Sequence, residues 1–527
     1  MATIFVSKTG NDSTGTGSQG NPYLTIGKAN TVATTSDMIR IRGGTYQEQN
    51  TWNQSGTALV PFTVMAHEDA GVREPVVIDG NNYALPGGAS NPGGTYQYGT
   101  WFENNFVGLM TFNGSYVLCQ GLKFQYSKGR GVEAEGLITA HTTNVTFRDL
   151  TVIHTRTSTV GVKYVDNVLV ENVYTEDGAN YAPFIRPTAG GQPNNHPAGV
   201  SFQVGFNLTV RNFTSKGHWG EGLMLNTIDG FLVELCWVCD MMSGNYYLHR
   251  AKNGTFRSNV GWFSDTSPYP PMAVGSAGSG VAMNNEDWRD DWGDRATYAY
   301  TWICANIDLY NNIMVACAPG FSILGGNTGA ANQGFLGFSR IRHWNNTVIR
   351  PRDIGLRVGT QSQITNAQFI NNAVHLGNFA GAIQTQFPNS NIAQNTRHHN
   401  AWSIAPEANA VGAGDVVGPL LLENPNILVS GPTGPILTNY VPKATSPIRN
   451  AGINLAGFTD DYYGDVRPSG AWSMGAIQYG GTAPPPPPPP PPPDPPPDPD
   501  PPVPPAGSED ARTAVPFTRT RKLRTFV

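Results

Sequence analysis

The sequence predicts an all-β solenoid, and three observations lead to that prediction. A phrase of the form N-x-x-[VF]-x-[ND] recurs along the middle of the chain, beginning at Asn144, Asn167 and Asn207, with looser copies at Gly230, Asn253, Asn306 and Asn366. The copies at 144 and 167, and those at 207, 230 and 253, are 23 residues apart. Apolar and polar residues alternate inside several copies, which is the period of a half-buried strand. A repeat of this length marks an array of stacked units.

The repeat unit fits one coil of a parallel solenoid. About 23 residues hold two or three short strands joined by tight turns, and such a coil cannot bury its apolar face alone. Stacking on the next coil lets the strands pair in parallel. The leading Asn suits a bend because it tolerates left-handed backbone angles, and stacked Asn side chains can bond to one another along the axis. We therefore predict a single-stranded right-handed parallel β-helix. A leucine-rich solenoid lacks the necessary Leu spacing here, and a propeller needs longer blades.

Composition narrows the partners. Only 13% of the residues are charged and the net charge is −5, which argues against nucleic acid. A surface of Asn, Thr, Ser, Gln and Gly suits carbohydrate hydroxyls, although a β-rich chain acquires the same composition without any ligand. We expect no membrane partner because no apolar run approaches spanning length. Residues 1–7 show no signal-peptide pattern, so we expect a native start without an export signal.

The five cysteines do not predict a disulfide framework, because their number is odd and the chain is long. Cys236 and Cys239 form a CxxC inside a strand-like stretch, where residues three apart face opposite sides. We interpret both as buried thiols rather than as metal ligands or a redox pair.

Both ends of the repeat region carry phrases of their own. They are FVSKTGND (5–12), GNPYLTI (20–26) and IRIRGGTY (39–46) at the start, and SPIRNAG (446–452), DYYGDVRP (461–468) and MGAI (474–477) at the end. These phrases resemble the opening and closing segments of bacterial and phage β-helix proteins of the pectate-lyase-like family. The resemblance covers about 1–480 and implies the fold, with a short capping helix at roughly 25–33. Because the group includes polysaccharide lyases, glycoside hydrolases, epimerases and non-enzymatic virion proteins, the resemblance implies no single reaction.

We predict four segments: an amino-terminal cap with the first strands at 1–50, the β-helix at 51–480, a proline-rich linker at 481–506, and a tail at 507–527. The unbroken prolines from 484 to 493 predict a polyproline II rod of roughly 30 Å. The tail is too short to fold alone. It combines basic and apolar residues, and we predict that it docks on a virion or capsid protein by adding a strand; a solvated, disordered end is the alternative. The residues predicted to dock are Val515, Phe517, Arg519, Arg521, Leu523 and Phe526.

Two insertions interrupt the 23-residue spacing of the repeat, at about 180–197 and 268–300. Insertions in solenoids leave as loops on one face and often build a binding surface. The richest chemistry lies between them, where we predict catalytic roles for Asp177, Lys216, His218, Glu221 and His249. Register counting places Lys163, Asn226 and His249 on one face, and Asp177 near His218. The residues predicted to bind substrate are Lys163, Trp219, Tyr246, Tyr247, Arg250, Trp288 and Trp292.

Two reactions fit these residues. A glycosidase needs two carboxyl groups, for which Glu221 and Asp177 are the first candidates and Glu286, Asp287, Asp290 and Asp291 the others. A lyase acting on uronic acids needs a base, here Lys216, His218 or His249, and a cation near the sugar carboxylate. The resemblance implies calcium in that role, and the acidic run at 286–294 could supply ligands, although it lacks the spacing of a calcium loop. Each candidate also has a structural interpretation, as a bend residue, a satisfied core group, a core stack or a solvated loop.

Three functions remain in competition. The first is a phage virion protein: a spike, a fibre or a capsid decoration. It would bind host-surface polysaccharide, either with or without degrading it, and residues 507–527 would anchor it to the particle. The resemblance to spikes of this fold suggests a homotrimer, although spikes commonly attach by the amino end. The second is a bacterial extracellular polysaccharide lyase or glycoside hydrolase. The third is a structural β-helix without a ligand.

Overall fold

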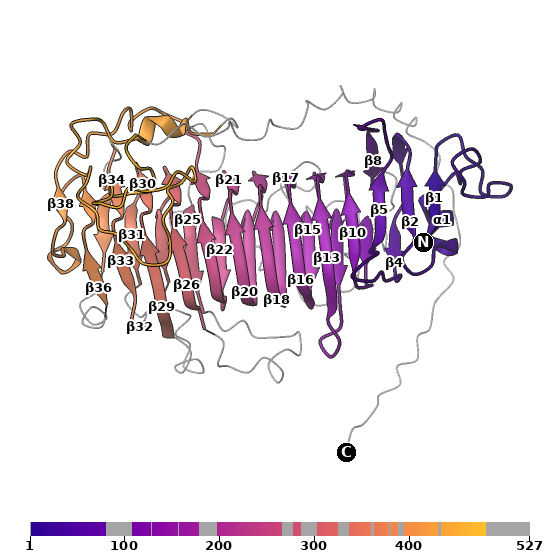
Figure 1. Cartoon of the computed structure of the whole chain (residues 1–527), viewed down its shortest axis with the longest axis horizontal. Helices are drawn as coiled ribbons and strands as arrows, with labels where there is room; N and C mark the ends of the chain where they lie inside the picture. Colours follow the sequence, from indigo (N-terminus) through magenta and orange to yellow (C-terminus); the bar gives the residue numbers. More distant parts are fainter. Residues whose placement is uncertain are drawn as a thin grey trace, which may run out of the picture. The chain divides into compact units, whose positions relative to one another are not determined.

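The computed structural model describes residues 2–80, 108–127, 129–155, 157–178, 198–265, 278–285, 303–324, 337–359, 363–377, 379, 381–387, 395–429 and 434–480. Its strands form a sheet of 23 strands, a sheet of 13 strands and a two-stranded hairpin. The largest sheet turns a corner within strands β18 and β20, so we treat its two arms separately as sheets A and B. The 13-stranded sheet is sheet C (Figure 1).

Sheet A consists of β4 (Asn50–Trp52), β9 (Met110–Phe112), β12 (Val132–Glu135), β15 (Val160–Lys163), the first halves of β18 (Val200–Arg211) and β20 (Leu223–Glu234), β22 (Gly244–His249), β25 (Ser279–Asn284), β28 (Phe321–Ile323), β31 (Ile354–Val358) and β35 (Ile383–Gln386). Sheet B consists of β1 (Thr3–Val6), β2 (Met38–Ile41), β5 (Phe62–Ala66), β10 (Val117–Gln120), β13 (Thr142–Arg148), β16 (Val165–Glu171), the second halves of β18 and β20, β23 (Lys252–Arg257), β26 (Ala305–Tyr310), β29 (Gly337–Trp344), β32 (Gln363–Thr365), β33 (Gln368–Ile370) and β36 (Thr396–His398).

Sheet C consists of β3 (Gly44–Tyr46), β8 (Val76–Asp79), β11 (Lys123–Gln125), β14 (Thr151–Ile153), β17 (Tyr174–Glu176), β19 (Thr214–Lys216), β21 (Trp237–Cys239), β24 (Val260–Trp262), β27 (Ile313–Val315), β30 (Thr347–Ile349), β34 (Ala373–His375), β37 (Ala401–Trp402) and β38 (Val416–Val417). The remaining elements are helix α1 (Ile26–Val32), the hairpin of β6 (Glu68–Asp69) and β7 (Val72–Arg73), and the short 3-10 helices η4 (Ala408–Ala410) and η5 (Leu437–Tyr440).

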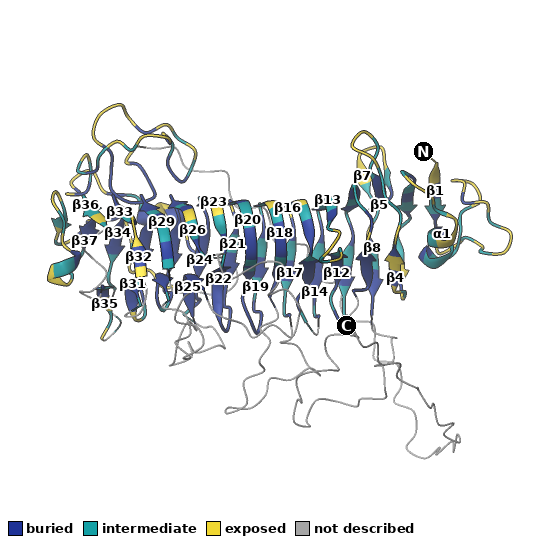
Figure 2. Ribbon diagram, turned by 90° about the horizontal axis from the view of Figure 1, so that it is seen from below, coloured by how far each residue is buried: buried dark blue, intermediate teal, exposed yellow. Residues whose placement is uncertain are grey.

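The strand register follows the repeat phrase. Val145 of β13 pairs with Val168 of β16, Val168 with Leu208 of β18, and Leu208 with Phe231 of β20, all in parallel. These apolar residues belong to one continuous buried cluster, and buried residues alternate with partly exposed ones along these strands (Figure 2). The pairing confirms the predicted parallel β-helix.

The Asn residues of the phrase occupy its bends. The leading residues Asn144, Asn167 and Asn207 have φ of 59°, 56° and 57°, in the left-handed region that Asn tolerates. Their side chains also bond between coils, as the sequence predicted: Asn207 Nδ2 donates to Asn167 Oδ1 at 3.1 Å. The closing residue of the phrase is left-handed too, as in Asn172 with φ of 54°.

A second Asn ladder lies inside the B–C corner and was not predicted. It runs through Asn259, Asn312, Asn346, Asn372 and Asn400, which are all buried. Asn259 Oδ1, the first of the ladder, accepts from Cys236 N, and each later Oδ1 accepts from the backbone and side-chain amides of the preceding member, as in Asn312 N and Nδ2 to Asn346 Oδ1 at 3.0 and 2.9 Å. Each Nδ2 donates to a backbone carbonyl, as in Asn346 Nδ2 to Leu309 O at 2.8 Å. The ladder therefore satisfies polar backbone groups that the turn would otherwise leave buried and unpaired.

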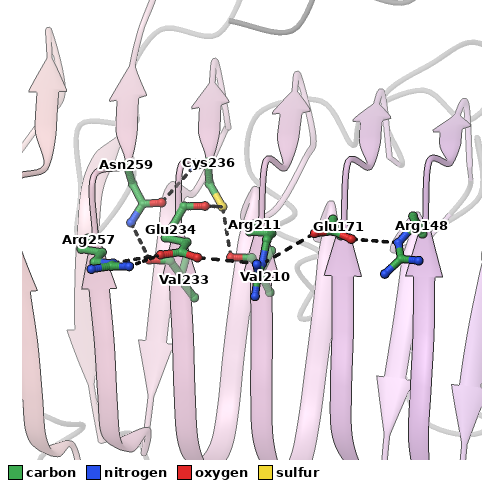
Figure 3. A network of polar contacts seen from close by, with 9 residues as sticks. All are labelled: Arg148, Glu171, Val210, Arg211, Val233, Glu234, Cys236, Arg257 and Asn259. Atoms are coloured by element: carbon green, nitrogen blue, oxygen red, sulfur yellow. Dashed lines mark hydrogen bonds and ion pairs between the residues drawn. The ribbon is translucent and has the colours of Figure 1, made fainter. Parts of the chain in front are cut away.

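A ladder of alternating charge follows the outer face of sheet B (Figure 3). The members stand in register in the order Arg148, Glu171, Arg211, Glu234 and Arg257. Arg148 Nε donates to Glu171 Oε2 at 2.8 Å, and Arg257 Nη2 donates to Glu234 Oε2 at 2.7 Å. Arg211 lies 3.8 Å from both carboxylates. Because these side chains are partly exposed, each pair is worth at most about 1 kcal/mol.

Two segments outside the coils pack against the stack. Helix α1 begins after Thr25, whose hydroxyl accepts from Lys28 N at 3.0 Å, and it buries Ile26 and Ala29 against the first coil, as predicted. At the other end the chain after β38 folds back over the outer side of sheet C. There Leu420, Leu437 and Tyr440 pack on outward-facing residues of sheet C. Val260, Ile313 and Ile349 are among these residues, and all six side chains belong to one apolar cluster.

All five cysteines are free and buried, as predicted. Cys236 belongs to the interior cluster, whereas Cys239 belongs to the cluster under the closing segment, so the two thiols face opposite sides of the strand. Within the described residues no helix is long and apolar enough to cross a membrane.

Candidate functional site

The outer face of sheet A carries a polar row that crosses six coils. In β15, Val160 and Val162 point into the core and the residues between and after them point outward, because side chains of a strand alternate. The row stands in register from β12 to β25: Glu135, Lys163, Gln203, Asn226, His249 and Asn284. Lys163, Asn226 and His249 therefore lie on one face, as the register count predicted. Neighbouring members are roughly 4.8 Å apart along the axis.

The members of this row differ in how much of each side chain is exposed to solvent. Glu135, Lys163, Gln203 and Asn226 are half-buried, whereas His249 is only 2% exposed. Tyr247, outward in the same strand as His249, is 7% exposed and stacks on the His249 ring at 5.9 Å between centroids. Burial lowers the pKa of His249 to about 3, with a smaller contribution from Arg250, so its imidazole is neutral at ordinary pH. A polymer can reach the first four positions of the row more readily than His249.

A cluster of aromatic and ionisable side chains adjoins the accessible end of the row, at the corner between sheets A and B. His141 Nδ1 lies 2.8 Å from Asp166 Oδ1. The His141 ring lies between the rings of Tyr164 and Phe206, with centroids 5.8 and 6.1 Å away. Lys163 Nζ lies 4.9 Å from the centroid of the Tyr164 ring. We call these five residues the corner cluster.

Apart from Lys163, which was predicted to bind substrate, the residues of the corner cluster were not predicted from the sequence. Their signal was present but weak: Asp166 directly precedes the copy of the phrase at Asn167, and His141 lies three residues before the copy at Asn144. Register counting from the leading Asn covered the strands and not the residues just before each copy.

Two of the other predicted catalytic residues, Lys216 and Asp177, lie on the sheet C side. Lys216 Nζ is 2.6 Å from Glu176 Oε1, and Asp177 contacts His154 at 3.5 Å. Burial lowers the pKa of Lys216, but the hydrogen bond and charge of Glu176 outweigh it and the pKa is raised overall. An amine with a raised pKa remains protonated, so this environment does not favour Lys216 as a base.

His218 lies in the interior. Its exposed fraction is 0%, its Nδ1 accepts from Gly178 N at 2.8 Å, and its Nε2 is 3.2 Å from Thr175 Oγ1. Burial lowers its pKa to about 3. The structure therefore places His218 as a bridge between two coils beside the residue that follows Asp177, a position that does not favour contact with a polymer.

Glu221 and Trp219 lie in the turn between β19 and β20, and both are buried. Glu221 Oε1 accepts from Ser243 Oγ at 2.9 Å. Tyr246 points into the core, where its hydroxyl lies 2.9 Å from the carbonyl oxygens of Cys236 and Val260. These positions favour the structural interpretation of the three residues, and their predicted catalytic and binding roles remain untested.

Arg250 lies at the A–B corner after His249, with φ of 49°, and its backbone N donates to Asn284 O at 3.1 Å. Several predictions fall outside the described residues: Trp288, Trp292, the acidic run at 286–294, both insertions for the most part, and the linker and docking tail. Among the residues that are described, no three His, Cys, Asp or Glu side chains are grouped so as to hold a metal ion.

The strand pairing and the polar row define the class: this chain is a parallel β-helix protein with an ionisable cluster at the edge of one sheet. No family model and no curated protein matches it. Among solved structures it is similar to pectate lyase Pel9A, at 15% identity over 91% of this chain and 97% of that one, with a TM-score of 0.49. It is also similar to a rhamnogalacturonan lyase, at 13% identity over 76% and 87%, with a TM-score of 0.42.

A third similar structure is a GH136 lacto-N-biosidase from Eubacterium ramulus, at 11% identity over 79% of this chain and 68% of that one, with a TM-score of 0.40. The assignment of the fold rests on the strand register described above.

Proposed function

We propose that this chain binds polysaccharide along the outer face of sheet A. The observation that carries the proposal is the in-register polar row, whose accessible members Glu135, Lys163, Gln203 and Asn226 supply donors and acceptors at a regular spacing. A linear polymer of sugars presents hydroxyl groups at regular intervals, so an extended chain can meet several coils at once. Tyr164 at the corner is buried and packs against the Lys163 ammonium, so it orients this member of the row.

The proposal extends to the setting: a phage virion protein, a spike, fibre or capsid decoration, that meets polysaccharide on the host surface. It is supported by the sequence after residue 480, where a proline-rich segment is followed by a basic and apolar tail. Removing residues 507–527 is expected to abolish attachment to the particle while leaving the β-helix folded. Sedimentation of particles mixed with the full and shortened chains measures this, and equal attachment of both would contradict the anchoring role.

Binding is tested by the double variant Gln203→Ala/Asn226→Ala. Loss of two hydrogen bonds of about 0.5–1.5 kcal/mol each should weaken binding of the recognised polysaccharide by roughly 5- to 160-fold. The matched control is Thr209→Ala/Thr255→Ala, which removes half-buried polar groups from the outer face of sheet B. Affinity measured against a panel of surface polysaccharides decides: no binding by the wild type, or equal losses in the two double variants, would contradict the proposal.

A second candidate function is cleavage of the bound polymer. It is favoured by the corner cluster, which brings a His–Asp pair and a Lys side chain to the accessible end of the row. A lyase fits better than a hydrolase, because each of the two carboxyls predicted for hydrolysis is engaged by a neighbouring side chain. Glu221 Oε1 accepts from Ser243 Oγ, and Asp177 contacts His154.

A further inference from the structure

We propose that His141 is the catalytic base of a lyase centre at the corner between sheets A and B, with Asp166 as its positioning residue and Lys163 as the cation that receives a uronate carboxylate. The inference rests on the proposed function, which places the polymer on the outer face of sheet A. It names a centre that lies away from the candidates on the sheet C side.

The His–Asp pair has a defined orientation. A carboxylate only accepts hydrogen bonds, so the 2.8 Å contact with Asp166 Oδ1 makes His141 Nδ1 the donor. Asp166 Oδ1 also accepts from Phe206 N at 3.1 Å, which fixes the carboxylate from a neighbouring coil. With its proton on Nδ1, the imidazole carries its lone pair on Nε2, the form that a general base requires.

Backbone bonds hold His141 close to Lys163 and Tyr164. Gly136 N donates to Lys163 O at 2.9 Å, and Thr142 N donates to Tyr164 O at 3.1 Å, so both ends of the turn that carries His141 are tied to the next coil. The Tyr164 ring contacts both the Lys163 ammonium and the His141 ring. The side chains of His141 and Asp166 are 11% and 23% exposed, so the pair is held in place and still reaches the surface.

This arrangement separates the two tasks of β-elimination. The Lys163 ammonium pairs with the uronate carboxylate and stabilises the negative charge that develops beside it. His141 Nε2 takes the proton from the ring carbon next to that carboxylate. The electron pair of the broken C–H bond forms a C=C bond as the glycosidic C–O bond breaks, and the leaving oxygen takes a proton from water. The imidazolium returns its proton to the hydroxide so formed, and no water is consumed.

The experiment uses the full chain with uronate-containing polysaccharides (pectate, alginate and hyaluronan) and dextran as a neutral polymer. We expect the wild type to release an unsaturated uronate, seen by its ultraviolet absorbance, from at least one acidic polymer and not from dextran. His141→Gln should reduce the rate by about 100-fold or more, the usual contribution of a general base. Lys163→Met should lower the rate on the acidic polymer strongly.

The matched control is His154→Gln, which removes a second His–Asp contact, to Asp177, away from the corner cluster and should leave the rate unchanged. For Asp166→Asn, kcat should fall more than KM changes.

The outcomes separate the two proposals. Binding without an unsaturated product from any acidic polymer overturns the lyase centre and leaves the binding function standing. Absence of binding overturns both. Product formation that survives in both His141→Gln and Asp166→Asn, with folding verified by unchanged thermal melting, overturns the assignment of the base. If His141→Gln does not fold, Lys163→Met tests the proposed lyase centre instead. Full activity of Lys163→Met on the acidic polymer would also contradict that centre.

Discussion

Replacing Arg467 by Met should destabilise the carboxy-terminal closing segment by about 4 kcal/mol, the scale expected when one partner of a buried charged network is removed. Arg467 is 3% exposed and its guanidinium is a hub. It donates to the carbonyl oxygens of Asp460, Ser473, Gly475 and Ala476 and to the side-chain oxygens of Gln478 and Asn311. Burial lowers its pKa to about 10, offset in part by Asp461 and Asp460, so it is still charged at neutral pH.

The loss should appear as detachment of the segment from the coils beneath it. Asn311 belongs to the B–C corner, so its bond to Arg467 Nη2 at 3.0 Å joins the segment to the stack. Faster proteolysis within 450–480 and a lower melting temperature are the expected readouts. The control is Arg211→Met on the charge ladder, which is partly exposed and should cost less than about 1 kcal/mol. Equal protection of Arg467→Met and wild type would contradict the role of the hub.

Replacing Asn346 by Ala should lower the free energy of unfolding by about 3 kcal/mol, because buried partners lose their hydrogen bonds at about 1–3 kcal/mol each. The groups left behind are Asn312 N and Nδ2, the Leu309 carbonyl and Asn372 Oδ1. Asn312, Leu309 and Asn372 are all buried, so these groups have little access to solvent. Thermal or urea unfolding measures the change.

The matched control for Asn346 comes from the other Asn ladder. Asn306 lies at an exposed bend, has φ of 53° and donates to Asn253 Oδ1 at 2.8 Å. Asn306→Gly keeps the left-handed backbone available and removes only an exposed hydrogen bond, so it should cost well under 1 kcal/mol. A loss for Asn346→Ala no larger than that of the control would show that the interior ladder contributes little.

The fold could be predicted because the backbone preferences and the apolar–polar pattern of the repeat phrase favour the same structure. The phrase supplied alternation for the strands and Asn for the left-handed bends, and α1 followed from the opening segment, where Thr25 caps it. The sequence also contains a sign of the interior Asn ladder, namely three pairs of consecutive Asn residues: Asn311–Asn312, Asn345–Asn346 and Asn371–Asn372. The first Asn of each pair has the left-handed backbone conformation of the bend, and the side chain of the second is buried in the ladder. The order of residue types in the sequence does not show which Asn has which role.

The candidate site was harder to predict. The register of the repeat shows which face of a sheet a side chain lies on, but it does not show how exposed that side chain is. It correctly put Lys163 and His249 in one row, but it could not show that His249 would be buried and Lys163 half-buried. The same limit applies to His218, a polar residue in a polar phrase that the fold turns into the interior. The His141–Asp166 contact depends on a turn outside the repeat, where no periodic rule applies.

The charge ladder on sheet B constrains how such a chain can change its length. Arg148, Glu171, Arg211, Glu234 and Arg257 alternate from coil to coil, so each carboxylate has a guanidinium on both sides. Duplication or deletion of one coil within this stretch would bring two like charges into register, whereas a change by two coils preserves the alternation. We therefore expect natural variants of this region to gain or lose coils in pairs, with parity set by electrostatics rather than by the core.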